Sequence, residues 1–79
     1  MKDVDNFNLN EFHKRIGNNV KRIRQEKGIS QLALSQAIGH KSVSVISYAE
    51  IYHKNYHFNL EHLGKISFVL DIDISEFFK

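Results

Sequence analysis

The chain has 79 residues, which is enough for one small domain, and 42% of them are hydrophobic. It contains no cysteine, so disulfides and thiolate metal ligands are excluded. Because its start (MKDVDNFNLN) is polar and it has no long apolar run, we expect neither a signal peptide nor a membrane span. The net charge is only +2, and we expect a soluble, cytoplasmic protein.

The charge is unevenly distributed along the chain. Residues 13–54 carry eight lysines and arginines against two glutamates, whereas residues 1–12 and 55–79 each have a net charge of −2. A basic middle segment between acidic flanks is typical of a surface that binds a polyanion. An ordinary solvated face would show the same pattern, so charge alone leaves both interpretations open.

The first predicted helix covers residues 9–27 and follows an N-terminal tail, residues 1–8. Asn8 is a suitable N-cap with Glu11 three residues later, and Phe7 and Phe12 have the spacing of a hydrophobic staple. Gly28 suits the position that ends the helix. Apolar residues recur at steps of three and four along one face: Leu9, Phe12, Ile16, Val20 and Ile23.

Three more helices are predicted from their caps. Ser30 and Gly39 bracket a short helix over residues 31–38. Asn59 opens a helix that extends to residue 70, and Asp73 with Glu76 has the spacing of a capping box for a last short helix that ends at residue 78.

Residues 42–49 read SVSVISYA, an alternation that is typical of a half-buried strand. No other segment offers this stretch a partner strand, and a lone strand cannot satisfy its backbone hydrogen-bonding groups. We therefore predict a helix with Ser42 as its N-cap, and the fold class is all-α. Its core-facing residues are Val45, Ile46 and Ala49, and its outward residues are Val43, Ser44, Ser47 and Tyr48.

Residues 28–50, GISQLALSQAIGHKSVSVISYAE, resemble the helix-turn-helix of the phage repressor and Cro type (XRE-like) family of DNA-binding regulators. Ser30 and Gln31 open the first helix of the motif, Gly39 makes its turn, Ile46 is the buried residue of the second helix and Glu50 closes it. The resemblance extends over residues 16–78. It implies a compact five-helix bundle of the lambda-repressor-like type, in a single domain over residues 9–79, with the motif formed by helices 2 and 3.

The resemblance also implies a sequence-specific transcriptional regulator that binds double-stranded DNA, as a homodimer on a short palindromic operator, with residues 43–50 in the major groove. One residue more than the usual family spacing lies between Gly39 and Ile46. The resemblance therefore leaves two assignments of the base-reading positions, which differ by one residue. The expected DNA-binding residues are Gln31, Lys41, Ser42, Val43, Ser44, Ser47, Tyr48, Lys54, Asn55 and Tyr56.

Two further sets of residues have expected roles. The resemblance implies a structural ion pair between Arg24 and Glu50, which would join the first helix to the end of the recognition helix. Phe68 stands where the family commonly has a polar residue, so we expect the dimer interface in the C-terminal part of the chain. The alternative is that the phenylalanines of this part complete a small core. The interface candidates are Phe68, Val69, Phe77 and Phe78.

Metal binding, catalysis and protein binding are the alternatives to DNA binding. His53, His57 and His62 suggest a metal site, but their loop is polar and no cysteine or nearby carboxylate completes a ligand set, so we expect no metal or cofactor. No serine, histidine and acid combination has a catalytic context, so we expect no enzyme and no small-molecule substrate. The alternative function is a protein-binding module, such as an antitoxin whose main partner is a toxin.

Overall fold

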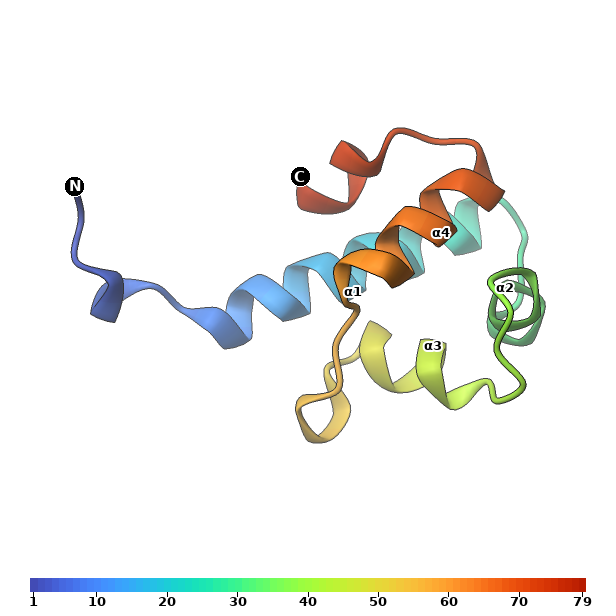
Figure 1. Cartoon of the computed structure of the whole chain (residues 1–79), viewed down its shortest axis with the longest axis horizontal. Coiled ribbons are helices and arrows are strands. Elements are labelled where there is room, and N and C mark those ends of the chain that lie inside the picture. Colours follow the sequence, from blue (N-terminus) through green and yellow to red (C-terminus); the bar gives the residue numbers. More distant parts are fainter.

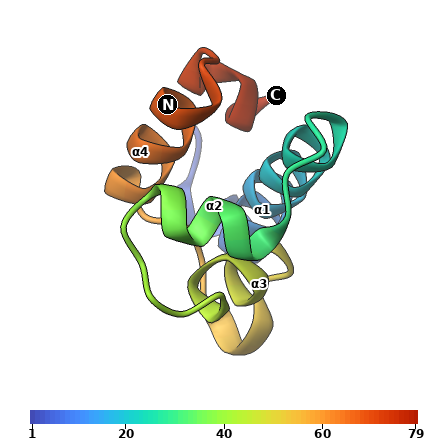
Figure 2. The same cartoon turned by 90° about the vertical axis from the view of Figure 1, so that its right-hand side faces the viewer.

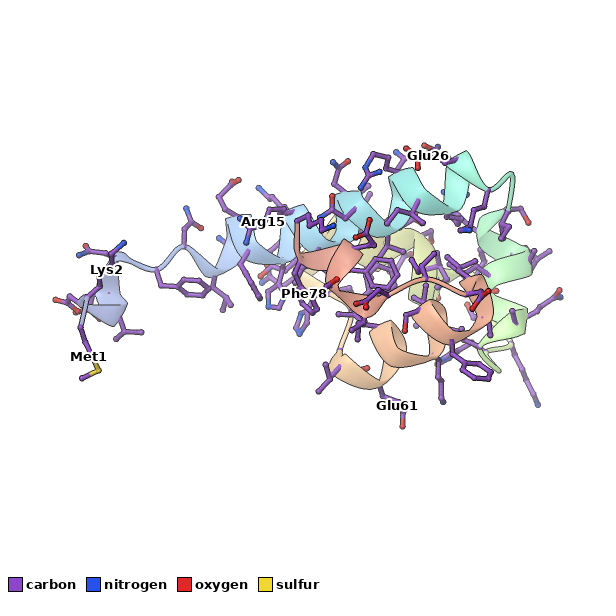
Figure 3. The ribbon with its side chains drawn as sticks, turned by 90° about the horizontal axis from the view of Figure 1, so that it is seen from above. Met1, Lys2, Arg15, Glu26, Glu61 and Phe78 are labelled. Atoms are coloured by element: carbon purple, nitrogen blue, oxygen red, sulfur yellow. The ribbon has the colours of Figure 1, made fainter.

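The computed structural model describes all 79 residues and contains four α-helices and no strand. The α-helices are α1 (Leu9–Glu26), α2 (Gln31–Ala37), α3 (Ser44–Glu50) and α4 (Leu60–Leu70). Three short 3₁₀ helices complete the order: η1 (Val4–Asn6), η2 (His53–Asn55) and η3 (Ile74–Phe78). The start of α1 projects beyond the body of the molecule, with Met1 and Lys2 at the far end of this extension (Figures 1 and 3).

The predicted caps explain where the first two helices begin and end. The Asn8 side chain accepts a hydrogen bond from the Glu11 N–H at 3.0 Å, and the rings of Phe7 and Phe12 lie 5.5 Å apart between centroids. Ser30 Oγ accepts from the Ala33 N–H at 3.0 Å. The predicted boundaries of α1 and α2 are therefore confirmed to within one residue.

One continuous core joins all four α-helices and η3. Val20, Leu34, Ile46 and Ile66 are completely buried, one from each α-helix, and Phe77 closes the core from η3. The remaining buried apolar residues surround them: Ile16, Ile23, Ile38, Ala49, Phe58, Leu63 and Leu70. The apolar periodicity of the sequence therefore corresponds to one shared interior.

The fifth helix is a single 3₁₀ segment, which corrects the expected bundle of five α-helices. The Asp73 side chain accepts from the Ser75 N–H at 2.9 Å, two residues on, whereas a capping box would bond to the third residue. The segment Ile74–Phe78 has five residues, and short segments of this kind commonly adopt the 3₁₀ hydrogen-bonding pattern. Phe77 is completely buried, so its expected place in a dimer interface is also corrected.

The segment SVSVISYA is helical, as predicted, but α3 begins later than expected. Its helical residues start at Ser44, and Val43 occupies the N-cap position without a side-chain hydrogen bond. Ser42 Oγ instead accepts from the Ser44 N–H at 3.2 Å, which closes a turn before the helix. The extra residue after Gly39 thus lengthens the turn and does not extend α3.

None of these helices combines the length and the hydropathy that crossing a lipid bilayer requires.

Candidate nucleic-acid interface

The two helices of the predicted motif, α2 and α3, lie next to each other, with α1 behind them (Figure 2). Gly39 begins the connection in a left-handed conformation at φ 88°. Ser35, which stands where the family usually has alanine, is completely buried, and its hydroxyl donates to the Leu32 carbonyl at 2.8 Å. The hydroxyl is therefore satisfied inside α2, and serine fits this position.

At Gly17 the backbone of α1 lies close against the backbone at the end of α3. A Cβ atom at Gly17 would lie 2.5 Å from the carbonyl oxygen of Ala49 and 2.7 Å from that of Glu50. Both neighbours are backbone atoms, which cannot rotate away as the end of a side chain can. The orientation of α3 on the body therefore depends on a residue without a side chain in α1.

A buried ion pair attaches the end of α3 to α1 and to the start of α2. Arg24 donates to both carboxylate oxygens of Glu50, from Nε at 2.7 Å and from Nη2 at 3.0 Å, and Nη1 donates to the Ile29 carbonyl at 2.7 Å. The Glu50 side chain is completely buried and that of Arg24 is 7% exposed. This is the bidentate geometry in which guanidinium and carboxylate interact most strongly.

Gln31 belongs to the same network. Its Nε2 donates to Glu50 Oε1 at 2.9 Å, and the side chain is half-buried. One amide N–H and the carbonyl oxygen of Gln31 have no further protein partner, so the residue keeps groups that can bind a ligand at the start of α2. Its position connects the ion pair to the outer surface.

The outward side of α3 carries the residues that the sequence predicts. Val43 is 38% exposed and Tyr48 40% exposed, Ser47 is half-buried, and Lys41 and Ser42 are exposed in the preceding turn. Ser44 is half-buried, and its hydroxyl lies 2.7 Å from that of Ser42, so these two side chains act as a pair. Short side chains here let a DNA groove approach the helix closely.

A groove runs between α3 and the segment that leads into α4. Tyr48 packs against two other rings on this surface. The centroid of its ring lies 4.7 Å from that of His53 and 5.6 Å from that of Tyr56. Sequence reasoning treated His57 and His62 only as metal candidates and did not single out His40. The structure places these three histidines in the wall of the groove. Its lining residues are His40, Ser42, Ser44, Val45, Tyr48, Ala49, Tyr56, His57 and His62.

Two histidines, His62 and His13, have a lowered pKa in the folded protein. Burial, and then the neighbouring His40, lower the pKa of His62. The Nδ1 atom of His62 accepts a hydrogen bond from the backbone N–H of Asn59 at 3.2 Å, and the backbone N–H of His62 donates to Asn59 Oδ1 at 2.7 Å. This reciprocal pair is a capping box, and it requires an unprotonated Nδ1. Burial and the neighbouring His57 lower the pKa of His13. No cluster of three or more histidine, aspartate or glutamate side chains has a geometry that could hold a metal ion.

The loop after α3 presents Lys54, Asn55 and Tyr56, all of which are exposed. Lys54 and Lys41 are the cations nearest in sequence to the two ends of α3. The guanidinium of Arg22 in α1 forms an exposed pair with Glu26 at 3.2 Å. Lys41 and Lys54 supply exposed positive charge in the segments on either side of α3.

The C-terminal part exposes apolar surface at three of the four expected interface positions. Phe68 is 85% exposed, whereas Val69 and Phe78 are exposed by 40% and 39%. Phe68 and Val69 line a shallow groove between α4 and the end of α2, together with Ala37, Ile38, Gly39, Gly64 and Lys65.

Comparison with known proteins identifies the family. A helix-turn-helix family model matches residues 20–77, which is most of the chain. The chain belongs to the helix-turn-helix family. The resemblance to the phage repressor and Cro type is thereby confirmed, and the protein is a DNA-binding transcriptional regulator.

A solved structure supports the same assignment. The restriction-modification controller protein C.AhdI from Aeromonas hydrophila is similar with a TM-score of 0.72 and 26% sequence identity, over 82% of this chain and 94% of that chain. A search of curated proteins found no match. This helix-turn-helix protein thus has the fold of a known controller protein along most of its length.

Proposed function

We propose that this helix-turn-helix protein binds a short two-fold symmetric site on double-stranded DNA as a homodimer, with α3 of each protomer in the major groove. The observation that carries the proposal is the anchored recognition helix. Gly17 and the Arg24–Glu50 pair fix the inner side of α3, while Val43, Ser47 and Tyr48 on its outer side stay accessible. A rigid helix with small accessible side chains is suited to reading base edges.

The interface would combine contacts to base edges with contacts to phosphates. Lys41, Ser42, Val43, Ser44, Ser47 and Tyr48 would face base edges, where lysine can donate to guanine and valine can pack on a thymine methyl group. Gln31 at the start of α2, and Lys54, Asn55 and Tyr56 in the loop, would contact phosphates and set the register on the duplex. Only the first group would distinguish one sequence from another.

A dimer is proposed because one module of this size covers too little DNA for a selective site. The exposed Phe68 and Val69 on α4, with Phe78, supply unpaired apolar surface for the second protomer. The similarity to a restriction-modification controller protein supports control of a restriction-modification locus as the biological setting, ahead of a phage repressor or a toxin-antitoxin regulator.

The proposal is tested by a binding selection on genomic fragments, repeated at low and high salt. We expect recovery of a two-fold symmetric site whose affinity falls steeply with salt, because neutralised phosphates release counterions. The position of the site in the genome then tests the setting. Sequence-indifferent binding, or none, would contradict the proposal and favour a protein partner.

The recognition face is tested separately with Ser44→Ala combined with Tyr48→Ala. We expect each lost base contact to weaken binding to the selected site by about 1 to 3 kcal/mol, with little change in binding to unrelated DNA. Arg22→Ala, on the far part of α1, is the control and should leave operator preference unchanged. An unaltered preference in the double variant would show that α3 does not read the site through these residues.

A further inference from the structure

The loop after α3 has an unusual backbone. Tyr52, Lys54 and Asn55 all adopt left-handed conformations, with φ of 56°, 49° and 66°. Asparagine tolerates this conformation, but tyrosine and lysine rarely adopt it because their Cβ atoms crowd the backbone. A short segment with this backbone persists only where surrounding contacts hold it.

The contacts that hold the loop come from the start of α1. The Tyr52 hydroxyl donates to Asn10 Oδ1 at 3.1 Å. The His13 ring stacks on the His57 ring with centroids 3.9 Å apart, and on the Tyr52 ring at 5.5 Å. We call these four residues, Asn10, His13, Tyr52 and His57, the α1–loop clamp.

The clamp encloses a defined stretch of chain. Tyr52 and His57 lie at its two ends, and residues 53–56 lie between them. Within it, the Tyr56 N–H donates to the His53 carbonyl at 2.9 Å, and His57 Nδ1 lies 3.0 Å from the Asn55 carbonyl oxygen, so the Nδ1–H tautomer donates there. Both ends of the enclosed loop are therefore fixed to one helix.

The α1 side of the clamp precedes the part of α1 that builds the core. Buried residues of α1 begin at Ile16, whereas Asn10 is exposed and His13 half-buried. Both residues also precede residues 20–77, the segment that the family model matches. In Figure 1 the loop lies below α1, beside the end of α3. Two of the four clamp residues, Asn10 and His13, therefore come from the part of α1 that precedes the matched segment.

We propose that the α1–loop clamp positions Lys54 to contact a DNA phosphate, with Asn10, His13, Tyr52 and His57 acting as positioning residues. The proposal rests on the proposed function, in which this loop meets the DNA backbone. The left-handed backbone at Lys54 persists only while the clamp holds the loop, so without the clamp the lysine leaves its place opposite the phosphate and the contact is lost. The clamp thus contributes to affinity without touching DNA.

The test measures affinity for the selected operator duplex by fluorescence anisotropy between 50 and 200 mM salt. Each phosphate contact contributes about −0.9 to the slope of log affinity against log salt concentration. If His13→Ala releases Lys54 in both protomers of a dimer, the slope becomes shallower by about 1.8. Over this salt range the variant then loses about tenfold less affinity than the wild-type protein does.

Four further variants separate positioning from a general effect on the fold. Lys54→Ala should reproduce the change in slope, and combining it with His13→Ala should add nothing, because both remove the same contact. His13→Phe keeps a planar ring for stacking and should retain the wild-type slope. Asn18→Ala, an exposed position in the same helix, is the matched control and should bind as the wild-type protein does.

The outcomes distinguish this proposal from the proposed function. Absence of sequence-specific binding by the wild-type protein would contradict the proposed function itself. A wild-type slope in His13→Ala, or full additivity with Lys54→Ala, would overturn the clamp while the proposed function stands. If His13→Ala fails to fold by circular dichroism, Asn10→Ala removes only the acceptor of the Tyr52 hydroxyl and carries the same prediction.

Discussion

At the residue scale, the position of α3 depends on two buried residues of α1. Gly17 allows close contact between the backbones of α1 and α3, and Arg24 neutralises the buried carboxylate of Glu50. Neither residue belongs to the surface that would read bases. Both decide where α3 is held, and so a substitution at either one acts on binding through the fold.

Gly17→Ala is expected to destabilise the protein and to weaken DNA binding. Alanine gains about 1 kcal/mol in helix propensity, but overpacking against fixed atoms costs about 1 to 3 kcal/mol, and the carbonyl oxygens of Ala49 and Glu50 cannot yield without moving α3. The melting temperature, measured by circular dichroism, should therefore fall by several degrees.

Gly64→Ala is the matched control, because a Cβ atom there meets nothing within 4 Å. It should stabilise the protein by about 1 kcal/mol, which raises the melting temperature by about 4 to 8 °C. Equal responses of the two glycines would show that α1 and α3 are not in close backbone contact.

Arg24→Ala is expected to cost about 3 to 5 kcal/mol of unfolding free energy, because the buried Glu50 carboxylate would lose its only cationic partner. Arg22→Ala removes an exposed pair with Glu26 and should cost less than about 1 kcal/mol. Thermal or urea unfolding of both variants provides the comparison. Similar small losses would mean that the Arg24–Glu50 pair is accessible to water.

At the element scale, the start of α4 makes stability depend on pH. His62 completes the capping box only while its Nδ1 is unprotonated, and burial, followed by His40, lowers its pKa. Glu61 acts in the opposite direction, whereas Lys65 and His57 add to the lowering. A lowered pKa in the folded state means that the unfolded chain binds the proton more readily, so this contribution is present above the ordinary pKa of about 6.5 and is lost as pH falls.

His62→Gln tests this dependence, since glutamine completes a capping box without titrating. The melting temperature of the wild-type protein should fall relative to that of the variant between about pH 7 and pH 5. His13, whose pKa is also lowered, is present in both proteins, and its contribution cancels in the difference. A constant difference between the two proteins across this range would contradict the assignment to His62.

At the scale of the whole molecule, Phe68 is the strongest candidate for contact between protomers, since 85% of its surface is exposed on an otherwise core-forming helix. Phe68→Glu should shift the protein toward monomer in sedimentation velocity, because burying an unpaired carboxylate in an apolar interface is unfavourable. Leu60→Glu makes the same change at the start of α4, where Leu60 is 74% exposed, and should leave association unaltered. An unchanged dimer with Phe68→Glu would remove this residue from the interface.

The sequence by itself determined the four α-helices of this protein, because helix starts depend on local signals, and its resemblance to a known family indicated the Arg24–Glu50 ion pair. Asn8, Ser30 and Asn59 mark helix starts through hydrogen bonds to residues three positions on, and the apolar spacing assigns each helix its inner side. The type of the last helix was not predicted correctly from the sequence. Its cap and aromatics suited an α-helix, and the hydrogen bond from Ser75 to Asp73 led to a 3₁₀ turn instead.

Only the tertiary structure decided which side chains are brought together across distant parts of the chain. The phenylalanines at positions 68 and 77 look alike in the sequence, yet one is almost fully exposed and the other completely buried, because α1 and α4 cover Phe77. The stack of His13 on His57 and the contact of Gly17 with Ala49 likewise join residues more than 30 positions apart. Periodicity reports which side of a helix is inward, whereas the neighbour on that side is set by how the helices pack.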